Sequence, residues 1–113
     1  NGSWGPPVNL GSQFNTERDD GYPYLTPDGA ELWFTAYTRD PDYPSLAMAI
    51  FRATRAGFDE ENGVWLWNDP EEVITRYAGE LAMDAERNLY FTHHFDDGTG
   101  HLVESDIYVA RHR

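Results

Sequence analysis

The segment Glu31–Ala36 (ELWFTA) recurs in this chain as Asn88–His93 (NLYFTH), and this match decides the fold. A second match, between Ala49–Arg55 (AIFRATR) and Asp106–His112 (DIYVARH), has the same spacing along the chain. Two separated matches at one spacing indicate an internal repeat, which is typical of arrays such as solenoids and propellers. Frequent aromatic residues and a Pro-Asp-Gly turn at residues 27–29 predict that the repeated elements are β-strands.

Each copy of the repeat predicts three strands, and a segment containing proline precedes each copy. The predicted strands lie at 22–26, 31–37 and 47–54 in the first copy and at 80–84, 88–94 and 106–111 in the second. Residues 4–10 and 67–74 match each other through Trp4 and Trp67. They are predicted as outer edge strands, because proline cannot donate to a central ladder. The predicted fold class is therefore all-β, with two four-stranded antiparallel blades of a β-propeller.

The strand order leaves the second blade without an outer strand of its own, whereas residues 4–10 place one ahead of the first blade. Propellers have about four to eight blades, so two blades do not close a ring alone. We expect the ring to close within a longer parent chain or by oligomerisation. The simplest oligomer is a homotrimer in which each chain lends its outer strand to the next. Residues 1–113 then form one propeller unit, with repeats at about 20–74 and 79–113.

The composition narrows the range of partners. The chain has 113 residues and a formal net charge of −12, which repels phosphate backbones, so nucleic acid is not an expected partner. No apolar run reaches the roughly 20 residues of a membrane span, so membrane insertion is not expected. The chain has no cysteine, which excludes disulfides, Cys-ligated zinc and thiol nucleophiles.

Four segments together resemble the repeats of the TolB-like, or WD-repeat-like, β-propeller family, and the resemblance covers nearly the whole chain. They are Pro7–Gly11, Phe14–Thr16, Pro23–Gly29 and Asp106–Ala110. The resemblance implies a non-catalytic propeller that acts as a scaffold or a binding surface for proteins or peptides. It also implies a place in the bacterial cell envelope, hence a periplasmic or secreted location. The first repeat departs from the family pattern at Ala49, where the second repeat has Asp106.

In a propeller the connections expected at 11–20, 38–45, 74–78 and 95–104 emerge on one face. They carry the acidic candidates Glu17, Asp19, Asp20, Asp40, Asp42, Asp96, Asp97 and Glu104. Loops on a rigid scaffold often hold binding sites, and an acidic face suits a divalent cation or a basic peptide. Calcium prefers such oxygen ligands, but no Asp-x-Asp-x-Asp-Gly loop is present. Calcium or another divalent cation is the one cofactor that the sequence leaves open.

His93 and His94 form a second candidate site with Glu80. Alternation along a strand sends the two rings to opposite faces, so one metal cannot take both. Either ring has two interpretations, a metal ligand together with Glu80 and Glu104 or Asp106, or a structural hydrogen bond to one of these carboxylates.

Aromatic residues support an alternative function, a carbohydrate-binding propeller of lectin type. The candidates for stacking on a sugar are Trp33, Tyr37, Tyr43, Trp65 and Trp67. Trp33 shares its repeat position with Tyr90 and is expected to pack between blades. Tyr43, in a predicted loop, is the best candidate for exposure. No serine lies in a Gly-x-Ser-x-Gly motif and no phosphate loop is present, so no enzyme activity is predicted.

Overall fold

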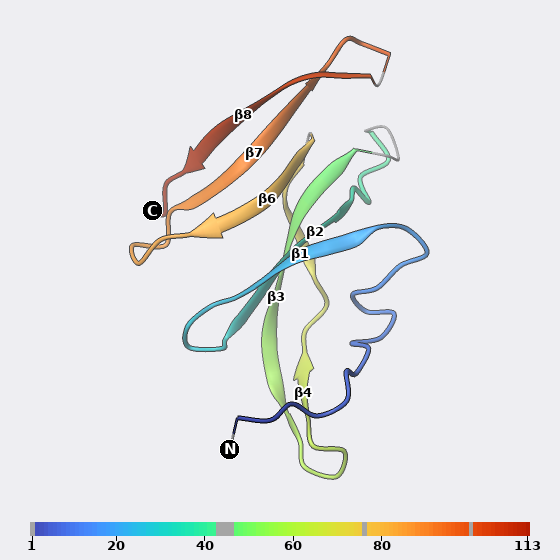
Figure 1. The fold of residues 1–113 in the computed structure, drawn as a ribbon, viewed down its shortest axis with the longest axis vertical. Helices are drawn as coiled ribbons and strands as arrows, with labels where there is room; N and C mark the ends of the chain where they lie inside the picture. The colour runs from blue at the N-terminus through green and yellow to red at the C-terminus, as the bar shows by residue number, and fades with distance from the viewer. Residues whose placement is uncertain (1, 43–46, 76, 100) are drawn as a thin grey trace.

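The computed structural model describes residues 2–42, 47–75, 77–99 and 101–113, and within these ranges the chain forms two antiparallel sheets and no helix (Figure 1). The strands are β1 (Asp20–Leu25), β2 (Glu31–Tyr37), β3 (Met48–Asp59), β4 (Val64–Trp67), β5 (Glu71–Ile74), β6 (Ala78–Met83), β7 (Leu89–Asp96) and β8 (Leu102–Ala110). The prediction of an all-β chain with antiparallel sheets is confirmed. Both sheets are open, and no closed sheet is formed by the described ranges.

The first sheet has the order β1-β2-β3, and both β4 and β5 pair with β3. β4 pairs with the distal part of β3, from Arg55 to Asp59, whereas β5 pairs with Ile50–Arg52. Of the outer strand predicted at 67–74, only Glu71–Ile74 forms a strand that pairs with the middle of β3, whereas β4 lies almost wholly before the predicted segment. The break between β4 and β5 includes Pro70, which has no backbone N–H to donate to a ladder.

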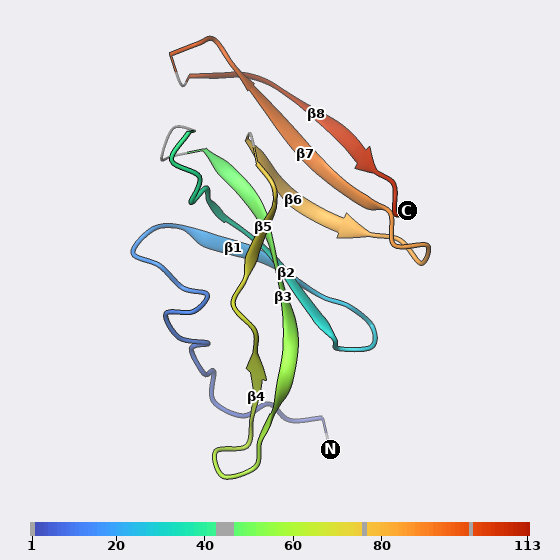
Figure 2. The ribbon, with the colours of Figure 1, turned by 180° about the vertical axis from the view of Figure 1, so that it is seen from behind.

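The second sheet has three strands in the order β6-β7-β8, and it lies beside the first sheet when the molecule is seen from either side (Figures 1 and 2). Trp33 and Ile50 of the first sheet are buried against Ala78, Leu89 and Phe91 of the second. Trp33, which was expected to pack between blades, packs between the two sheets. Tight burial of these apolar side chains is the main force that holds the sheets together.

The predicted turn at residues 27–29 forms as its chemistry requires. The backbone N–H of Gly29 donates to the carbonyl of Thr26 at 2.8 Å, and that of Ala30 donates to Asp28 Oδ1 at 3.0 Å. Gly29 has a φ of 71°, which glycine adopts without a steric penalty. Arg87 takes a similar conformation in the β6–β7 turn, with a φ of 68°. This turn therefore uses a residue type that adopts positive φ less readily.

The two sheets share an irregularity at matching positions of β1 and β6. The pairing of β1 with β2 shifts between Gly21 and Tyr24, and that of β6 with β7 shifts between Gly79 and Ala82. Tyr22 and Glu80, one in each bulge, have positive φ values of 50° and 54°. Bulges of this kind bend a strand and increase its twist.

The strand predicted at residues 4–10 is not formed. This segment is exposed along its length and makes no strand pairing within the described chain. Pro6 and Pro7 remove two backbone donors, so the segment needs a sheet edge beside it to become a strand. The second sheet has three strands, where a four-stranded blade was predicted.

Candidate functional site

A cleft of about 530 Å³ lies between the connection that leads into β1 and the end of β2. Its lining residues come from Thr16–Arg18 on one side and Tyr37–Pro41 on the other. The sequence predicts that these two connections emerge on one face, and in this part of the chain they do meet. The β7–β8 turn lies along the same side of the molecule (Figures 1 and 2).

The first wall of the cleft is held by Asp20 and by apolar packing. Asp20 Oδ2 accepts a hydrogen bond from the backbone N–H of Thr16 at 2.7 Å, and Thr16 Oγ1 accepts one from that of Arg18 at 3.1 Å. Phe14 is buried against Phe34 and Trp67, with ring centroids 5.5 and 6.1 Å away. The connection is thus fastened at both ends, which limits its motion.

The second wall is held by Glu72 of β5. Its carboxylate accepts from Thr38 Oγ1 at 2.7 Å, from the backbone N–H of Arg39 at 2.8 Å and from Thr75 Oγ1. Burial raises the pKa of Glu72, but the hydrogen bonds from Thr38 and Thr75 outweigh burial and lower the pKa below its ordinary value. Glu72 is therefore ionised at neutral pH, when a charged acceptor binds these donors most strongly.

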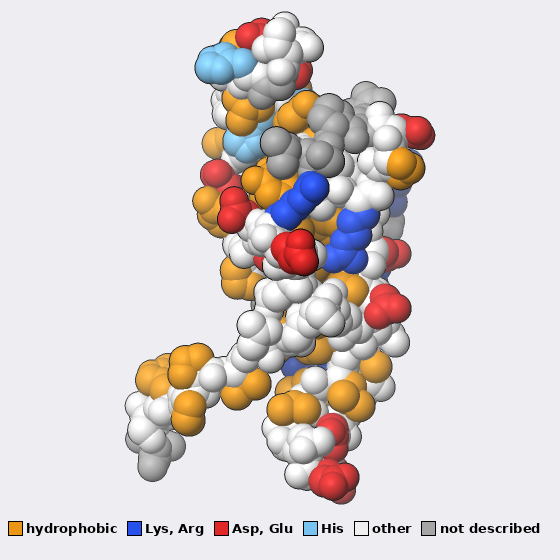
Figure 3. Space-filling view, turned by 90° about the vertical axis from the view of Figure 1, so that its right-hand side faces the viewer, with side chains coloured by type: hydrophobic (Ala, Val, Ile, Leu, Met, Phe, Trp, Pro, Cys, Tyr) orange, Lys and Arg blue, Asp and Glu red, His pale blue; other side chains and the backbone are white. Residues whose placement is uncertain are grey.

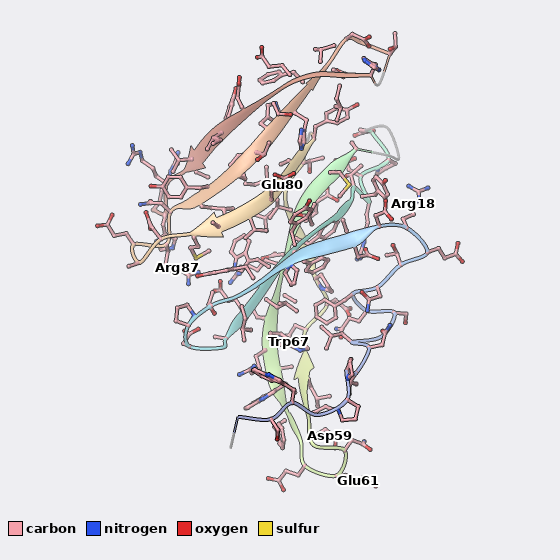
Figure 4. All side chains as sticks on the ribbon, viewed as in Figure 1. Arg18, Asp59, Glu61, Trp67, Glu80 and Arg87 are labelled. Atoms are coloured by element: carbon pink, nitrogen blue, oxygen red, sulfur yellow. The ribbon has the colours of Figure 1, made fainter. Side chains whose placement is uncertain are left out.

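The cleft has mixed charge, although the sequence predicts an acidic face. Glu17 and Asp40 line it together with Arg18 and Arg39. The guanidinium of Arg18 lies 5.6 Å from the ring centroid of Tyr37, and that of Arg39 lies 4.8 Å from the ring of Phe51. Basic and acidic side chains are visible side by side in the middle of this face (Figure 3), and Arg18 lies at its edge near the start of β1 (Figure 4).

The other acidic candidates mainly stabilise turns. Asp40 Oδ1 accepts from the backbone N–H of Asp42, and Asp97 Oδ1 accepts from that of Thr99, both at 2.9 Å. Asp19 Oδ2 is 3.4 Å from Tyr37 Oη. Asp96 lies at the end of β7, and Glu104 of β8 pairs with Phe95. Tyr43, the predicted sugar-stacking residue, lies outside the described residues.

His93 and His94 project to opposite faces of β7, as the alternation predicts. The ring of His93 packs against Phe95 and Tyr108, with centroids 4.6 and 5.1 Å away. His94 Nδ1 is 2.7 Å from Ser105 Oγ, across to β8. These contacts fit the structural interpretation of the two rings, although their partners are aromatic rings and a serine and not the expected carboxylates.

Glu80 is exposed at the bulge of β6 (Figure 4). Among the described residues no three histidine or acidic side chains gather into a group suited to a metal ion. The calcium site stays a prediction for which the described residues supply no cluster of ligands.

A cluster of charged side chains lies between the sheets, and the sequence analysis did not predict it. Glu31 Oε1 accepts from Arg87 Nη2 and from Trp33 Nε1, each at 2.9 Å. Glu31 Oε2 is 3.3 Å from Arg52 Nη2, and Arg52 Nη1 is 2.8 Å from Glu71 Oε1. Figure 4 shows Arg87 beside the turn that joins β6 and β7 of the second sheet, so this pair joins the two sheets. No local sequence motif predicts this ion pair, because Glu31 and Arg87 are far apart in sequence.

The aromatic candidates lie away from a common surface. Trp33 is buried and Trp67 packs against the core that contains Phe14. Of the candidates that the structure describes, Tyr37 alone lines the cleft. Trp65 is half exposed on β4, but the guanidinium of Arg55 lies 3.9 Å from its ring centroid. A face that holds a cation in this way is not free to stack on a sugar.

No family model, curated protein or solved structure matches this chain. The resemblance to TolB-like propellers therefore stands on the sequence motifs alone. No helix in the described ranges has the length and apolar character that crossing a membrane requires.

Proposed function

We propose that this chain is a non-catalytic binding module of the β-propeller type, and that it holds a peptide in the cleft between Thr16–Arg18 and Tyr37–Pro41. In the first sheet β1, β2 and β3 follow one another, and both β4 and β5 pair with the outer edge of β3. This order supports the interpretation of the first sheet as a propeller blade. The motifs shared with TolB-like propellers support the same interpretation, and with it a periplasmic or secreted location.

The observation that carries the proposal is the anchoring of both cleft walls. Asp20 fixes the first wall and Glu72 fixes the second through hydrogen bonds to backbone N–H groups. A site whose walls are fixed before binding loses less conformational entropy when the ligand arrives. The volume, about 530 Å³, is within the range of about 300–1,000 Å³ that is usual for ligand sites.

The charges of the cleft indicate the chemistry of the ligand. Arg18 and Arg39 attract carboxylates, whereas Glu17 and Asp40 attract amines and guanidinium groups. A peptide that carries charges of both signs meets all four groups. A purely basic peptide, which the acidic composition favours, would meet the two arginines as like charges.

The carboxyl groups whose pKa values depart from the ordinary ones are used to hold structure. Six carboxyl groups have a resolved pKa shift, and every one of these pKa values is lowered. General acid catalysis near neutral pH uses a carboxyl group whose pKa is raised. Local hydrogen bonds in turns lower the pKa of Asp28, Asp59, Asp84 and Asp97, whereas Glu72 binds the end of β2 and Glu31 binds Arg87, Trp33 and Arg52, so all six carboxylates hold structure.

An array of random-sequence dodecapeptides tests the proposal. We expect the chain to bind a subset of peptides with charges of both signs, and we expect Arg39→Ala to weaken that binding about tenfold, equivalent to about 1.4 kcal/mol. Arg113→Ala, which removes the same charge at an exposed position outside the cleft, is the matched control. Absence of peptide binding, or equal binding by Arg39→Ala, would contradict the proposal. A signal on a glycan array that Trp65→Ala abolishes would favour the carbohydrate-binding alternative instead.

A further inference from the structure

We infer that this chain assembles head to tail with further copies of itself, through a groove on the first sheet and the outward face of the second sheet. The partner is a second copy of the chain. The groove and the peptide cleft share no lining residue, although Phe14 and Asp20, which hold the first wall of the cleft, also line the groove. The inference goes beyond the proposed ligand binding, because it identifies the residues that join one copy to the next.

The contact between the two sheets within one chain is the template for the interface. Trp33 and Ile50 project from the first sheet and pack on Ala78, Leu89 and Phe91 of the second. The approach is close at Gly79, where an added Cβ would lie 3.4 Å from Thr35 Cγ2. The first sheet thus supplies projecting side chains, and the second supplies the surface that receives them.

The projecting side chains have exposed counterparts on the second sheet. In the sequence match Trp33 corresponds to Tyr90, and Ile50 corresponds to Ile107. Tyr90 is 42% exposed and Ile107 is 82% exposed, whereas Trp33 and Ile50 are 7% and 0% exposed. An isoleucine that is buried in one repeat and almost fully exposed in the other indicates a surface that a partner covers.

The receiving surface also has a counterpart, and it is hollow. Gly79, Leu81, Leu89 and Phe91 correspond in the sequence match to Gly21, Pro23, Leu32 and Phe34. These last four residues line one groove of about 280 Å³, together with Val8 and Leu10 of the N-terminal segment. The groove thus has the same walls as the surface that holds Trp33 and Ile50. Tyr90 and Ile107 of a second copy are the side chains that fit it.

The N-terminal segment supplies a second contact with the same neighbour. Strand β5 covers the edge of β3, while β8, which corresponds to β3, has no outer strand in the described chain. The segment that matches β5 is residues 4–10, which project from the molecule and carry hydrophobic side chains (Figure 3). By the register of Arg52 with Glu71, Val8 of one copy lies opposite Val109 of the next. An exposed sheet edge is a ready site for such strand addition.

The interface between copies differs from the internal one in its charges. Glu31 and Arg87, which join the sheets within a chain, correspond in the sequence match to Asn88 and Gly29. The interface between copies therefore lacks this ion pair and depends on apolar contacts and strand pairing. We expect assembly to persist in high salt, which screens ion pairs.

Light scattering on the full chain tests the assembly. We expect a closed ring, with three copies giving six blades and a mass three times the chain mass of 12.9 kDa. Ile107→Glu should reduce the mass to that of one copy, because it places a charge in the groove. The matched control is Leu66→Glu, which places the same charge at an exposed apolar position on a different strand, β4. This variant should keep the mass of the wild type. A single-copy mass for the wild type at all concentrations, or equal effects of the two variants, would overturn the inference.

A disulfide between copies tests the register. The chain has no cysteine, so the double variant Val8→Cys and Val109→Cys introduces the only thiols. Oxidised glutathione, the electron acceptor, should link separate copies into ladders that a reductant dissolves. The pair Val73→Cys and Val109→Cys is the control and should form no link. Linked copies in both double variants, or in neither, would refute the proposed strand exchange. This result does not depend on whether Ile107→Glu folds.

Discussion

Replacement of Glu31 by alanine removes the carboxylate that three side chains share between the two sheets. Arg87 and Trp33 lose a charge-assisted acceptor at 2.9 Å, and Arg52 loses one at 3.3 Å. The Glu31 side chain is only 13% exposed, so its network is largely shielded from water. The consequence is a loss of stability that reaches both sheets, because Arg87 belongs to the second sheet and Glu31 to the first.

The size of this loss follows from the exposure of the partners. Removal of one member of a buried ion pair costs about 3–5 kcal/mol, because the other charge is left unsolvated. Here Arg52 and Arg87 are 31% and 39% exposed and regain part of their hydration, and Arg52 keeps its ion pair with Glu71. We therefore expect the free energy of unfolding to fall by about 2 kcal/mol. Glu31→Gln keeps an acceptor for Trp33 and should lose about half of that amount.

Urea unfolding at pH 7 measures the effect, and Glu71 provides the control. Glu71 binds the same Arg52 at 2.8 Å but is 63% exposed, so Glu71→Ala should cost less than about 1 kcal/mol. For a domain of this size 2 kcal/mol corresponds to a fall in Tm of roughly 8 °C. Equal losses in Glu31→Ala and Glu71→Ala would refute the argument, because burial would then make no difference to the value of the ion pair.

The other predictions concern pH, the core and the backbone. Burial raises the pKa of both Glu31 and Glu72, but hydrogen bonds outweigh it and hold each pKa below the ordinary 4.5. A lowered pKa in the folded state gives stability above pH 4.5 that is lost as the pH falls further, and an acid titration followed by tryptophan fluorescence should be flatter for Glu31→Gln/Glu72→Gln. Phe14→Ala should cost about 3 kcal/mol in urea unfolding, because it empties a buried site between Phe34 and Trp67. Glu80→Val should lower Tm by several degrees and Glu80→Gly should not, because only glycine relieves a φ of 54°.

The strands and turns were the most predictable features, because neighbouring residues decide them. The segment 31–37 was predicted as a strand and forms β2 with the same bounds. The Pro-Asp-Gly turn depends only on the positive φ of Gly29 and on the hydrogen bond that the Asp28 side chain accepts from the backbone N–H of Ala30. Alternation likewise sets the two rings of His93 and His94 on opposite faces.

The candidate site was only partly predictable. The sequence analysis placed the connections before β1 and after β2 on one face, and these connections line the cleft. It missed Arg18 and Arg39, because a count of charges along the chain does not tell which side chains turn into a cleft. It also predicted that the acidic residues bind a ligand, whereas Asp40 and Asp97 accept hydrogen bonds from nearby backbone N–H groups.

Taken by itself, the sequence determined an all-β chain, the order of its predicted strands and the turn at residues 27–29, since periodicity and turn chemistry act over a few residues. Only the tertiary structure decided that Glu31 meets Arg87, because that contact depends on how one sheet packs on another. It also decided that residues 4–10 form no strand in the single chain. A strand at those positions needs a partner edge, and no propensity of its own residues can supply one.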